Sequence, residues 1–183
     1  GRQVGDAGGR HVAPGFVDPH THSDISLLQH PRAESVVRQG VTTHVTGNCG
    51  MSAAPLGAAH REETLHNWAH YWDISGVAWD WTSFRQYLRA LERAGAAINI
   101  APLVGHGALR LAVMGLAERP PTEKQQALMA RLLDAALRAG AHGLSTGLVY
   151  PPGCYASTDE LVRLCRVVGD VEHGGEAAPV LGR

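Results

Sequence analysis

Directly after an apolar run, the chain reads Gly15-Phe16-Val17-Asp18-Pro19-His20-Thr21-His22-Ser23-Asp24, which places two histidines two positions apart. Successive side chains of a β-strand point to opposite faces, so His20 and His22 are expected on one face, about 6 to 7 Å apart. Asp18 falls on that face too, where it can orient a ring or accept an outer hydrogen bond. Alone, the pair would equally fit a strand end with solvated histidines. The rest of the chain favours a shared divalent metal.

The composition fits one ordinary domain with a small-molecule ligand. The chain has 183 residues, and 44% of them are hydrophobic, which is enough for a sizeable core. Its net charge is −1, with acidic and basic residues interspersed. We therefore expect neither a nucleic acid nor an anionic membrane surface as a partner.

The cysteines and the hydropathy of the chain indicate the cellular compartment in which the protein is expected. The three cysteines, Cys49, Cys154 and Cys165, lack CxxC spacing, which argues against a disulfide scaffold or a zinc ribbon. The chain starts without a basic segment followed by an apolar one, and it has no run of about 18 apolar residues. We therefore expect a cytoplasmic protein without a secretion signal or a membrane span.

Apolar runs alternate with segments of helical period, which is typical of repeated strand-helix units around a parallel sheet. The predicted strands are residues 12–20, 41–46, 97–106 and 142–148. The predicted helices are residues 31–38, 82–94, a segment starting near 122, and 158–169. Between the second strand and the helix at Thr82 lies an irregular stretch that carries the tryptophans, and its length indicates a functional lid or wall.

The strand ends decide between an open doubly wound sheet and a barrel. They carry His20 and His22, then Cys49, then His106, then the turn at residues 145–150. A barrel gathers all such ends around one mouth. We therefore predict an α/β fold, a TIM barrel of which only about the first four β/α units are present.

Cys49 lies in the turn Gly47-Asn48-Cys49-Gly50, after the strand that follows the histidine strand. A thiolate there could ligate zinc or act as a nucleophile, whereas an unplaced cysteine is usually buried and inert. The flanking glycines allow the backbone to present the sulfur, and mixed imidazole and thiolate donors favour zinc over magnesium or calcium. We therefore predict that Cys49 ligates a metal.

Three further signals are weaker. His66 and His70 are four apart in an expected helix, but Asn67 stands where the His-Glu-x-x-His motif has its glutamate, so surface histidines are expected. His106 either hydrogen-bonds a substrate or braces a loop. Lys124, the only lysine, lies in a polar helix start and is expected to be solvated, so no lysine is placed to bridge two metal ions.

The last predicted strand leads into a rigid, proline-containing loop. Ser145 superficially suggests a serine nucleophile, but no third triad member is placed, so a structural strand end is expected. Tyr150 lies in the loop that follows, where its hydroxyl either donates to a substrate carboxylate or covers the core. We favour contact with a substrate.

Several motifs, taken in order, resemble the amidohydrolase superfamily. Residues 13–24 resemble its metal-binding motif. Residues 40–50, 104–110 and 143–153 look like the D-aminoacylase (N-acyl-D-amino-acid deacylase) branch in particular. The resemblance covers roughly residues 6–175, and the order of several motifs makes it specific.

This resemblance implies a zinc-dependent TIM barrel of the metal-dependent hydrolase type that hydrolyses the amide of N-acyl-D-amino acids. His20 and His22 match its metal-binding pair, Cys49 its cysteine ligand and Tyr150 the loop tyrosine that meets the substrate carboxylate. We expect His106 to contact substrate with Tyr150. Zn²⁺ is the expected cofactor, because it polarises the scissile carbonyl and lowers the pKa of a bound water toward about 7.

The family pattern also implies two further metal-binding histidines and a late aspartate, the general base and acid, which this chain does not contain. We expect residues 1–11 to be a remnant of the connection to a small β-domain, 12–175 the N-terminal half of the barrel, and 176–183 a divergent or truncated tail. The chain then holds no catalytic residue of its own, and we expect weak or no turnover. Open barrel edges should favour self-association.

Two alternatives stay open. The first is another amidohydrolase, such as a dihydropyrimidinase-like cyclic amidase, which the presence of Cys49 and the lack of a suitable lysine argue against. The second belongs to a different class, a non-catalytic zinc-binding half-barrel or a nonfunctional remnant.

Overall fold

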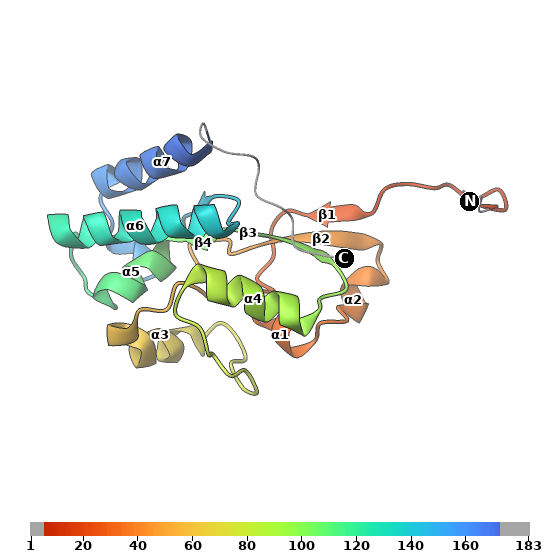
Figure 1. Ribbon diagram of the computed structural model, residues 1–183, viewed down its shortest axis with the longest axis horizontal. Coiled ribbons are helices and arrows are strands. Elements are labelled where there is room, and N and C mark those ends of the chain that lie inside the picture. The colour runs from red at the N-terminus through yellow and green to blue at the C-terminus, as the bar shows by residue number, and fades with distance from the viewer. Residues whose placement is uncertain (1–5, 173–183) are drawn as a thin grey trace.

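The computed structural model describes residues 6–172, whose short strands run parallel to their neighbours. β1, β2 and β3 form one sheet in that order, and β4 pairs with β5 (Figure 1). Parallel pairing between strands that helices connect confirms the predicted α/β class. The predicted tail at residues 176–183 lies outside the described residues. The strands are β1 (Phe16–Asp18), β2 (Val41–Thr46), β3 (Asn99–Pro102), β4 (Val104–Gly105) and β5 (Leu144–Ser145).

Three predicted strands are shorter in the structure, among them the last, which was expected at residues 142–148 and is limited to Leu144–Ser145. The second strand is confirmed at Val41–Thr46, but the first, expected at residues 12–20, is limited to Phe16–Asp18. Pro14 and Pro19 flank this short strand, and proline cannot donate to a ladder. The strand expected at residues 97–106 is split at Leu103, whose amide donates to the Thr46 carbonyl at 2.9 Å. The next amide, of Val104, donates to Gly143 instead, so the chain changes its bonding neighbour at this point.

The helices lie around the strands, and Figure 1 shows α6 running alongside α5 and α7. Helices α4 and α6 both begin with a capping box, formed by Ser83 with Gln86 and by Thr122 with Gln125. The helices and 3₁₀ segments are α1 (Ser26–Gln29), α2 (Glu34–Val37), η1 (Ala58–His60), α3 (Arg61–Trp68), α4 (Phe84–Ala94), α5 (His106–Met114), α6 (Glu123–Ala139), η2 (Gly153–Tyr155) and α7 (Thr158–Glu172).

Helix α5 was not predicted. Its sequence is apolar around most of its circumference, and its side chains are buried almost throughout, including Leu109 and Leu111 with no exposed surface. A helix that is apolar all round has no polar face, so no helical period marks it in the sequence. Because α5 begins at His106, that residue opens a helix instead of ending a strand.

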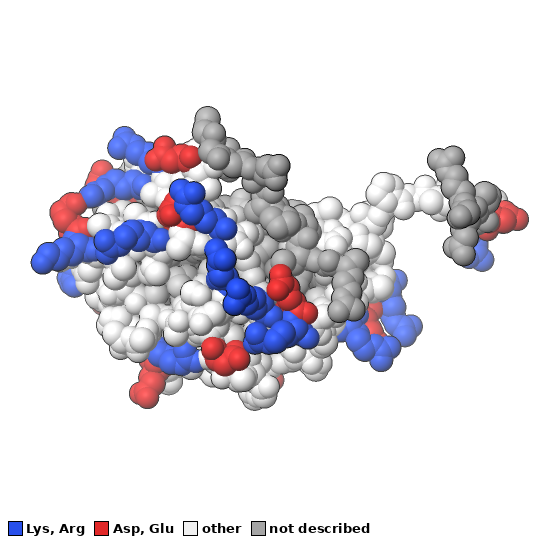
Figure 2. Space-filling model, in the orientation of Figure 1, with Lys and Arg blue, Asp and Glu red and all other residues white. Residues whose placement is uncertain are grey.

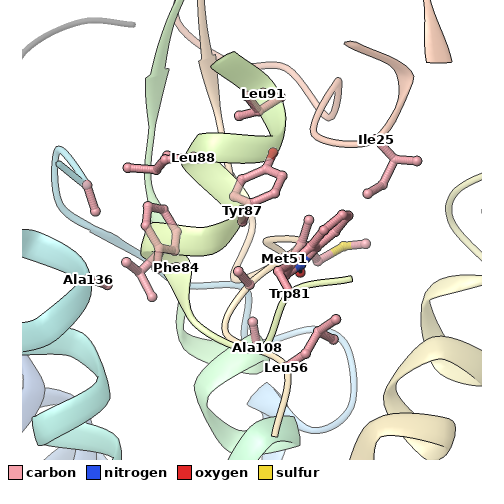
Figure 3. Packing of buried hydrophobic residues seen from close by; sticks show 14 of the residues in the cluster. Ile25, Met51, Leu56, Trp81, Phe84, Tyr87, Leu88, Leu91, Ala108 and Ala136 are labelled. Atoms are coloured by element: carbon pink, nitrogen blue, oxygen red, sulfur yellow. Dashed lines mark hydrogen bonds between the residues drawn. The ribbon is translucent and has the colours of Figure 1, made fainter. Parts of the chain in front are cut away.

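The irregular tryptophan-bearing stretch is part of the core. Trp68, Trp72, Trp79 and Trp81 are each at most 9% exposed. Figure 3 shows Trp81 beside Tyr87 of α4 and Met51, and the Trp81 indole donates to the Ala53 carbonyl at 2.9 Å. Burying one such ring removes roughly 200 Å² from water, which contributes about 5 kcal/mol before entropy costs. This packing fixes residues 51–53, which directly follow the turn that carries Cys49.

The surface carries charges of both signs. Red and blue groups adjoin on the face drawn in Figure 2, and exposed ion pairs include Arg163 with Glu123 at 2.6 Å and Arg138 with Asp134 at 3.0 Å. Among the described residues, every helix is too short or too polar to cross a bilayer.

Candidate metal centre

The structure brings His20, His22 and Cys49 together at the ends of β1 and β2. One ligand atom from each residue lies within 4.8 Å of the others. His20 Nε2 is 3.1 Å from Cys49 Sγ, and the two imidazole rings meet edge to face with centroids 5.6 Å apart. Within residues 6–172, these residues form the only group of three or more His, Cys, Asp or Glu placed to share one ion.

The two histidines lie in a loop beyond β1, not on the strand itself, which corrects the expectation from their spacing. Thr21, between them, still bonds to β2, since both its amide (3.1 Å) and its hydroxyl (2.9 Å) donate to the Val45 carbonyl. Anchoring Thr21 to β2 leaves the flanking rings free to turn toward Cys49. Asp18 does not orient a ring by hydrogen bonding among the described contacts; its carboxylate accepts from the His20 amide at 3.1 Å.

Residues 47–50, which we call the Cys49 turn, have a left-handed backbone at three positions. Gly47, Cys49 and Gly50 have φ values of 74°, 55° and 72°. Glycine adopts this conformation freely, whereas Cys49 adopts it only against a steric cost. The turn must therefore be held by contacts from outside, and their effect is to present the Cys49 sulfur toward the two imidazoles.

Two side chains hold the Cys49 turn from the side of β1 and β2. The Asn48 amide donates to the carbonyls of Thr21 at 3.2 Å and Val45 at 2.9 Å. The buried Asp24 carboxylate accepts from the Gly47 amide at 3.2 Å. These bonds connect the histidine loop and the Cys49 turn directly, so the two segments that carry the candidate ligands are fixed relative to one another.

Burial sets the protonation of the groups around the cluster. The pKa of His22 is lowered, first by burial and then by the neighbouring charge of His20. Burial likewise lowers the pKa of His44, against the opposing effect of Asp18, and the Ser23 hydroxyl lies 2.9 Å from His44 Nδ1. A lowered pKa keeps an imidazole neutral, which is the form that binds a metal.

Asp24 responds to the same burial in the opposite direction. Desolvation raises its pKa to about 7, although the hydrogen bond from the Gly47 amide acts against this rise. Near neutral pH its carboxyl therefore adds less than a full negative charge beside the cluster.

The donor set fits a zinc ion. Tetrahedral zinc has Zn–N distances of about 2.0 Å and Zn–S distances of about 2.3 Å, which separates a nitrogen from a sulfur ligand by about 3.6 Å. The observed 3.1 Å between His20 Nε2 and Cys49 Sγ is close to this separation. Two imidazoles and one thiol also match the borderline-soft character of zinc and leave at least one coordination position for other groups.

A small hollow adjoins the cluster. Cys49 lines it together with Met51, Trp68, Tyr71 and Tyr150. The rings of Tyr71 and Tyr150 meet edge to face with centroids 6.4 Å apart, and Tyr150 is 37% exposed. The Tyr150 loop and Cys49 thus border the same space.

The tryptophan-bearing region forms one wall of this hollow, through Trp68 and Tyr71. It also touches the histidine loop, because the Trp72 indole donates to the His22 carbonyl at 3.0 Å. The sequence indicated a lid or wall here, but it did not single out Trp68, Tyr71 or Trp72 individually. The density of aromatic residues was the one signal available for them.

His106 was expected to contact substrate, and the structure instead buries its ring completely. Its Nε2 lies 2.8 Å from a carboxylate oxygen of Glu160, which also pairs with Arg110 at 2.7 Å. The pKa of Glu160 is lowered: desolvation alone would raise it, but the hydrogen bonds from His106 and Arg110 prevail. Complete burial of the ring and its contact with Glu160 favour the alternative in which His106 braces a loop.

The other weak candidates lie away from the cluster. His66 and His70 are exposed, with ring centroids 5.3 Å apart, and α3 ends between them at Trp68. Lys124 is exposed in the first turn of α6, as expected for a solvated residue.

Parallel strands with connecting helices gather imidazole and thiol donors where two neighbouring strands end, which is the arrangement of an α/β protein with a candidate metal site at its strand ends. The sequence profile of the amidohydrolase family matches residues 3–170. The chain belongs to this family, as its motifs indicated.

Similar proteins within the family act on acylated D-amino acids. The chain is 47% identical over 168 residues to the N-acyl-D-aspartate deacylase of Alcaligenes xylosoxydans xylosoxydans, covering 91% of this chain and 32% of that enzyme. It shares 43% identity and a TM-score of 0.74 with a D-aminoacylase structure described as having a binuclear metal centre, over 88% of this chain and 33% of that one.

A third similar protein was solved with a bound metal. It is the N-acyl-D-glutamate deacylase of Bordetella bronchiseptica, complexed with zinc and a phosphonate that mimics the tetrahedral intermediate. The TM-score is 0.73 at 38% identity, over 86% of this chain and 32% of that one. The chain spans about a third of the length of the relatives it matches.

Proposed function

We propose that this chain carries one side of the active site of a zinc-dependent N-acyl-D-amino-acid deacylase, which converts an N-acyl-D-amino acid and water into a carboxylate and a D-amino acid. The observation that supports this most directly is the shared geometry of His20, His22 and Cys49, whose donor atoms lie within 4.8 Å of one another. The similarity to three D-amino-acid deacylases agrees with it. The four predicted strands, the third of which is divided into β3 and β4, are then the first part of a (β/α) barrel.

The three proposed ligands bind the metal in two chemical forms, imidazole and thiolate. His20 and His22 bind as neutral imidazoles, which the lowered pKa of His22 favours. Cys49 binds as a thiolate and faces the hollow. When bound, the zinc ion supplies a Lewis acid for the scissile carbonyl and lowers the pKa of a water toward about 7.

Tyr150 orients the substrate. Its hydroxyl, in a loop that borders the hollow, donates to the carboxylate of the N-acyl-D-amino acid. The apolar wall formed by Met51, Trp68 and Tyr71 excludes water from the bound substrate. The proposed substrate class is therefore a small molecule with an α-carboxylate next to an acylated amine.

No carboxylate belongs to the ligand cluster in residues 6–172, so no described residue is assigned as general base. The resemblance implies that an aspartate outside this chain has that role. Hydrolysis by the chain alone should accordingly be slow, because positioned acid–base catalysis contributes about 10² to 10⁴ in rate. Metal and substrate binding should be retained more fully than turnover.

The test measures both properties. The chain is loaded with zinc, and release of the free amino acid from N-acetyl-D-aspartate, N-acetyl-D-glutamate and N-acetyl-D-methionine is assayed, with the L-enantiomers as matched controls. Binding of a phosphonate analogue of the acylated D-amino acid is measured by calorimetry with and without zinc. We expect zinc-dependent binding that prefers the D-enantiomer. Equal binding of both enantiomers, or binding that ignores zinc, would contradict the proposal.

A second candidate, a non-catalytic zinc-binding module, is favoured by one observation, the lack of a carboxylate in the described cluster. It predicts stoichiometric zinc binding without affinity for either enantiomer. The cyclic amidase is less favoured, because Lys124 is exposed on α6 and is not part of the cluster.

A further inference from the structure

The hydroxyl of Ser145 bridges the two ends of the Cys49 turn. Its oxygen accepts a hydrogen bond from the Gly50 amide at 3.0 Å and donates to the Gly47 carbonyl. Ser145 lies on β5, 95 positions from Gly50, so this contact is made by the fold and not by the local chain. One hydroxyl thereby closes a ring around Asn48 and Cys49.

A hydroxyl can make both contacts at once. A serine side chain offers one donor and two acceptor positions, whereas alanine offers neither. Gly47 and Gly50 are both buried, so without Ser145 one amide and one carbonyl would lose a partner where water does not readily replace it. The bridge therefore constrains the turn at the point where its left-handed backbone most needs support.

The bridge acts from the side opposite to the contacts of Asn48 and Asp24. Those two residues connect the turn to the histidine loop and to β2, while Ser145 connects it to β5. The backbone next to Ser145 also packs closely against the turn, since a Cβ added at Gly147 would overlap the Cys49 carbonyl. The turn is thus clamped between two sheets, which fixes the direction of the Cys49 sulfur.

The two hydrogen bonds of the Ser145 hydroxyl also explain why Ser145 is not a nucleophile. Its surrounding sequence, Gly143-Leu144-Ser145-Thr146-Gly147, has the spacing of a nucleophile elbow. In the structure, however, Ser145 belongs to β5, and its oxygen is engaged with two backbone groups of the Cys49 turn. Among the described residues, the hydroxyl of Ser145 bonds to two backbone groups and to no imidazole that could accept its proton, as a serine nucleophile would require.

We propose that Ser145 is a positioning residue for the metal ligand Cys49, acting through the backbone of the turn and touching neither metal nor substrate. The predicted change in metal affinity rests on the proposed metal centre. The predicted change in hydrogen exchange at the Cys49 turn does not. Outer residues that orient a ligand typically change metal affinity by about 10- to 100-fold when they are removed.

The test uses the 183-residue chain with cobalt(II) as the probe, because cobalt bound to a thiolate gives a ligand-to-metal charge-transfer absorption. Ser145→Ala should weaken cobalt binding by about tenfold and reduce this absorption. Ser145→Thr retains the hydroxyl and should restore both. Ser83→Ala, which removes a hydroxyl that caps α4, is the matched control for a loss of stability alone and should leave both unchanged.

A double-mutant cycle makes the role specific to Cys49. In a Cys49→Ser background, Ser145→Ala should no longer affect cobalt affinity, because the ligand that it positions has been removed. The same loss of affinity with and without Cys49 would overturn the proposal. So would an affinity and charge-transfer absorption that Ser145→Ala leaves unchanged.

Hydrogen exchange at the Gly50 amide separates this inference from the proposed function. Ser145→Ala should accelerate exchange at Gly50 but not at Leu56, whose amide donates to Thr82 at 2.8 Å. If the unchanged chain binds no cobalt, the proposed metal centre is wrong. The exchange rate at Gly50 still tests whether Ser145 bridges the Cys49 turn. If Ser145→Ala does not fold, slow Gly50 exchange in the unchanged chain supports the bridge, and exchange at the unprotected rate overturns it.

Discussion

Nε2 of His20 lies 3.1 Å from Sγ of Cys49, although the two residues are 29 positions apart. The parallel pairing of β1 with β2 produces this proximity, because Asp18 is opposite His44 and both strands then end on the same side. A side chain from each strand end therefore reaches the same point, and the candidate metal centre depends on this register.

Replacing Cys49 by serine removes the only sulfur donor of the cluster. We expect Cys49→Ser to weaken zinc binding by at least about tenfold, measured by competition with a chromophoric chelator, because a hydroxyl is a far poorer zinc ligand than a thiolate. The matched control is Cys165→Ser, which alters an exposed cysteine on α7. Equal zinc affinity for the two variants would show that Cys49 is not a ligand.

A methyl group at Gly147 tests the close approach of two backbones. Its Cβ would overlap the Cys49 carbonyl, so Gly147→Ala must displace the Cys49 turn. We expect a loss of about 1 to 3 kcal/mol in the free energy of unfolding, together with weaker zinc binding.

Gly169→Ala is the control for this change. No heavy atom lies within 4 Å of a Cβ at Gly169, which is inside α7, so alanine there should stabilise the chain by roughly 0.5 to 1 kcal/mol. Urea denaturation followed by tryptophan fluorescence measures both variants. A Gly147→Ala chain as stable as the unchanged one would mean that the turn can shift without cost.

Tyr150→Phe keeps the ring contact with Tyr71 and removes only the hydroxyl. If that hydroxyl donates to the substrate carboxylate, its removal should weaken binding of the phosphonate analogue by about tenfold or more, because hydrogen bonds to charged groups contribute about 1.5 to 3 kcal/mol. Tyr155→Phe, which changes the hydroxyl beside Glu118, is the control. Calorimetry in the presence of zinc should separate the two, and similar affinities would leave Tyr150 with a purely structural role.

The sequence predicted those features that follow from local chemistry. His20, His22 and Cys49 could be selected because their residue types and the glycines around Cys49 are recognisable without a structure. The β-branched run at Val41–Thr46 likewise specified β2. In these cases neighbouring residues alone determine the outcome.

The features that the sequence did not predict depend on contacts between segments that are far apart in the chain. The helix at His106 is apolar around most of its circumference because α6 and η1 cover it, so its period is hidden in the sequence. His106 therefore opens this helix directly after β4 instead of ending the strand. The role of Ser145 depends on a hydroxyl meeting a turn 95 positions away. Neither partner carries a local pattern that points to the other.

The buried carboxylate of Glu160 gives the last prediction. Its side chain is 1% exposed and pairs with Arg110 and His106, so Glu160→Gln leaves the Arg110 guanidinium buried without a counter-charge. We expect the variant to lose about 3 kcal/mol in the free energy of unfolding near neutral pH. Asp134→Asn, in the exposed pair with Arg138, is the control and should change stability little.

The pH dependence distinguishes a charge effect from a packing defect at Glu160. The fold lowers the pKa of Glu160 below its ordinary value of 4.5, so its ionised form stabilises the native state above that value. This contribution is fully present near neutral pH and is lost as pH falls below about 4.5 through the lower, folded pKa. The difference in unfolding free energy between the unchanged chain and Glu160→Gln, measured without metal in urea, should therefore shrink on acidification. A difference that stays constant from neutral to acid pH would assign the loss to packing instead of charge.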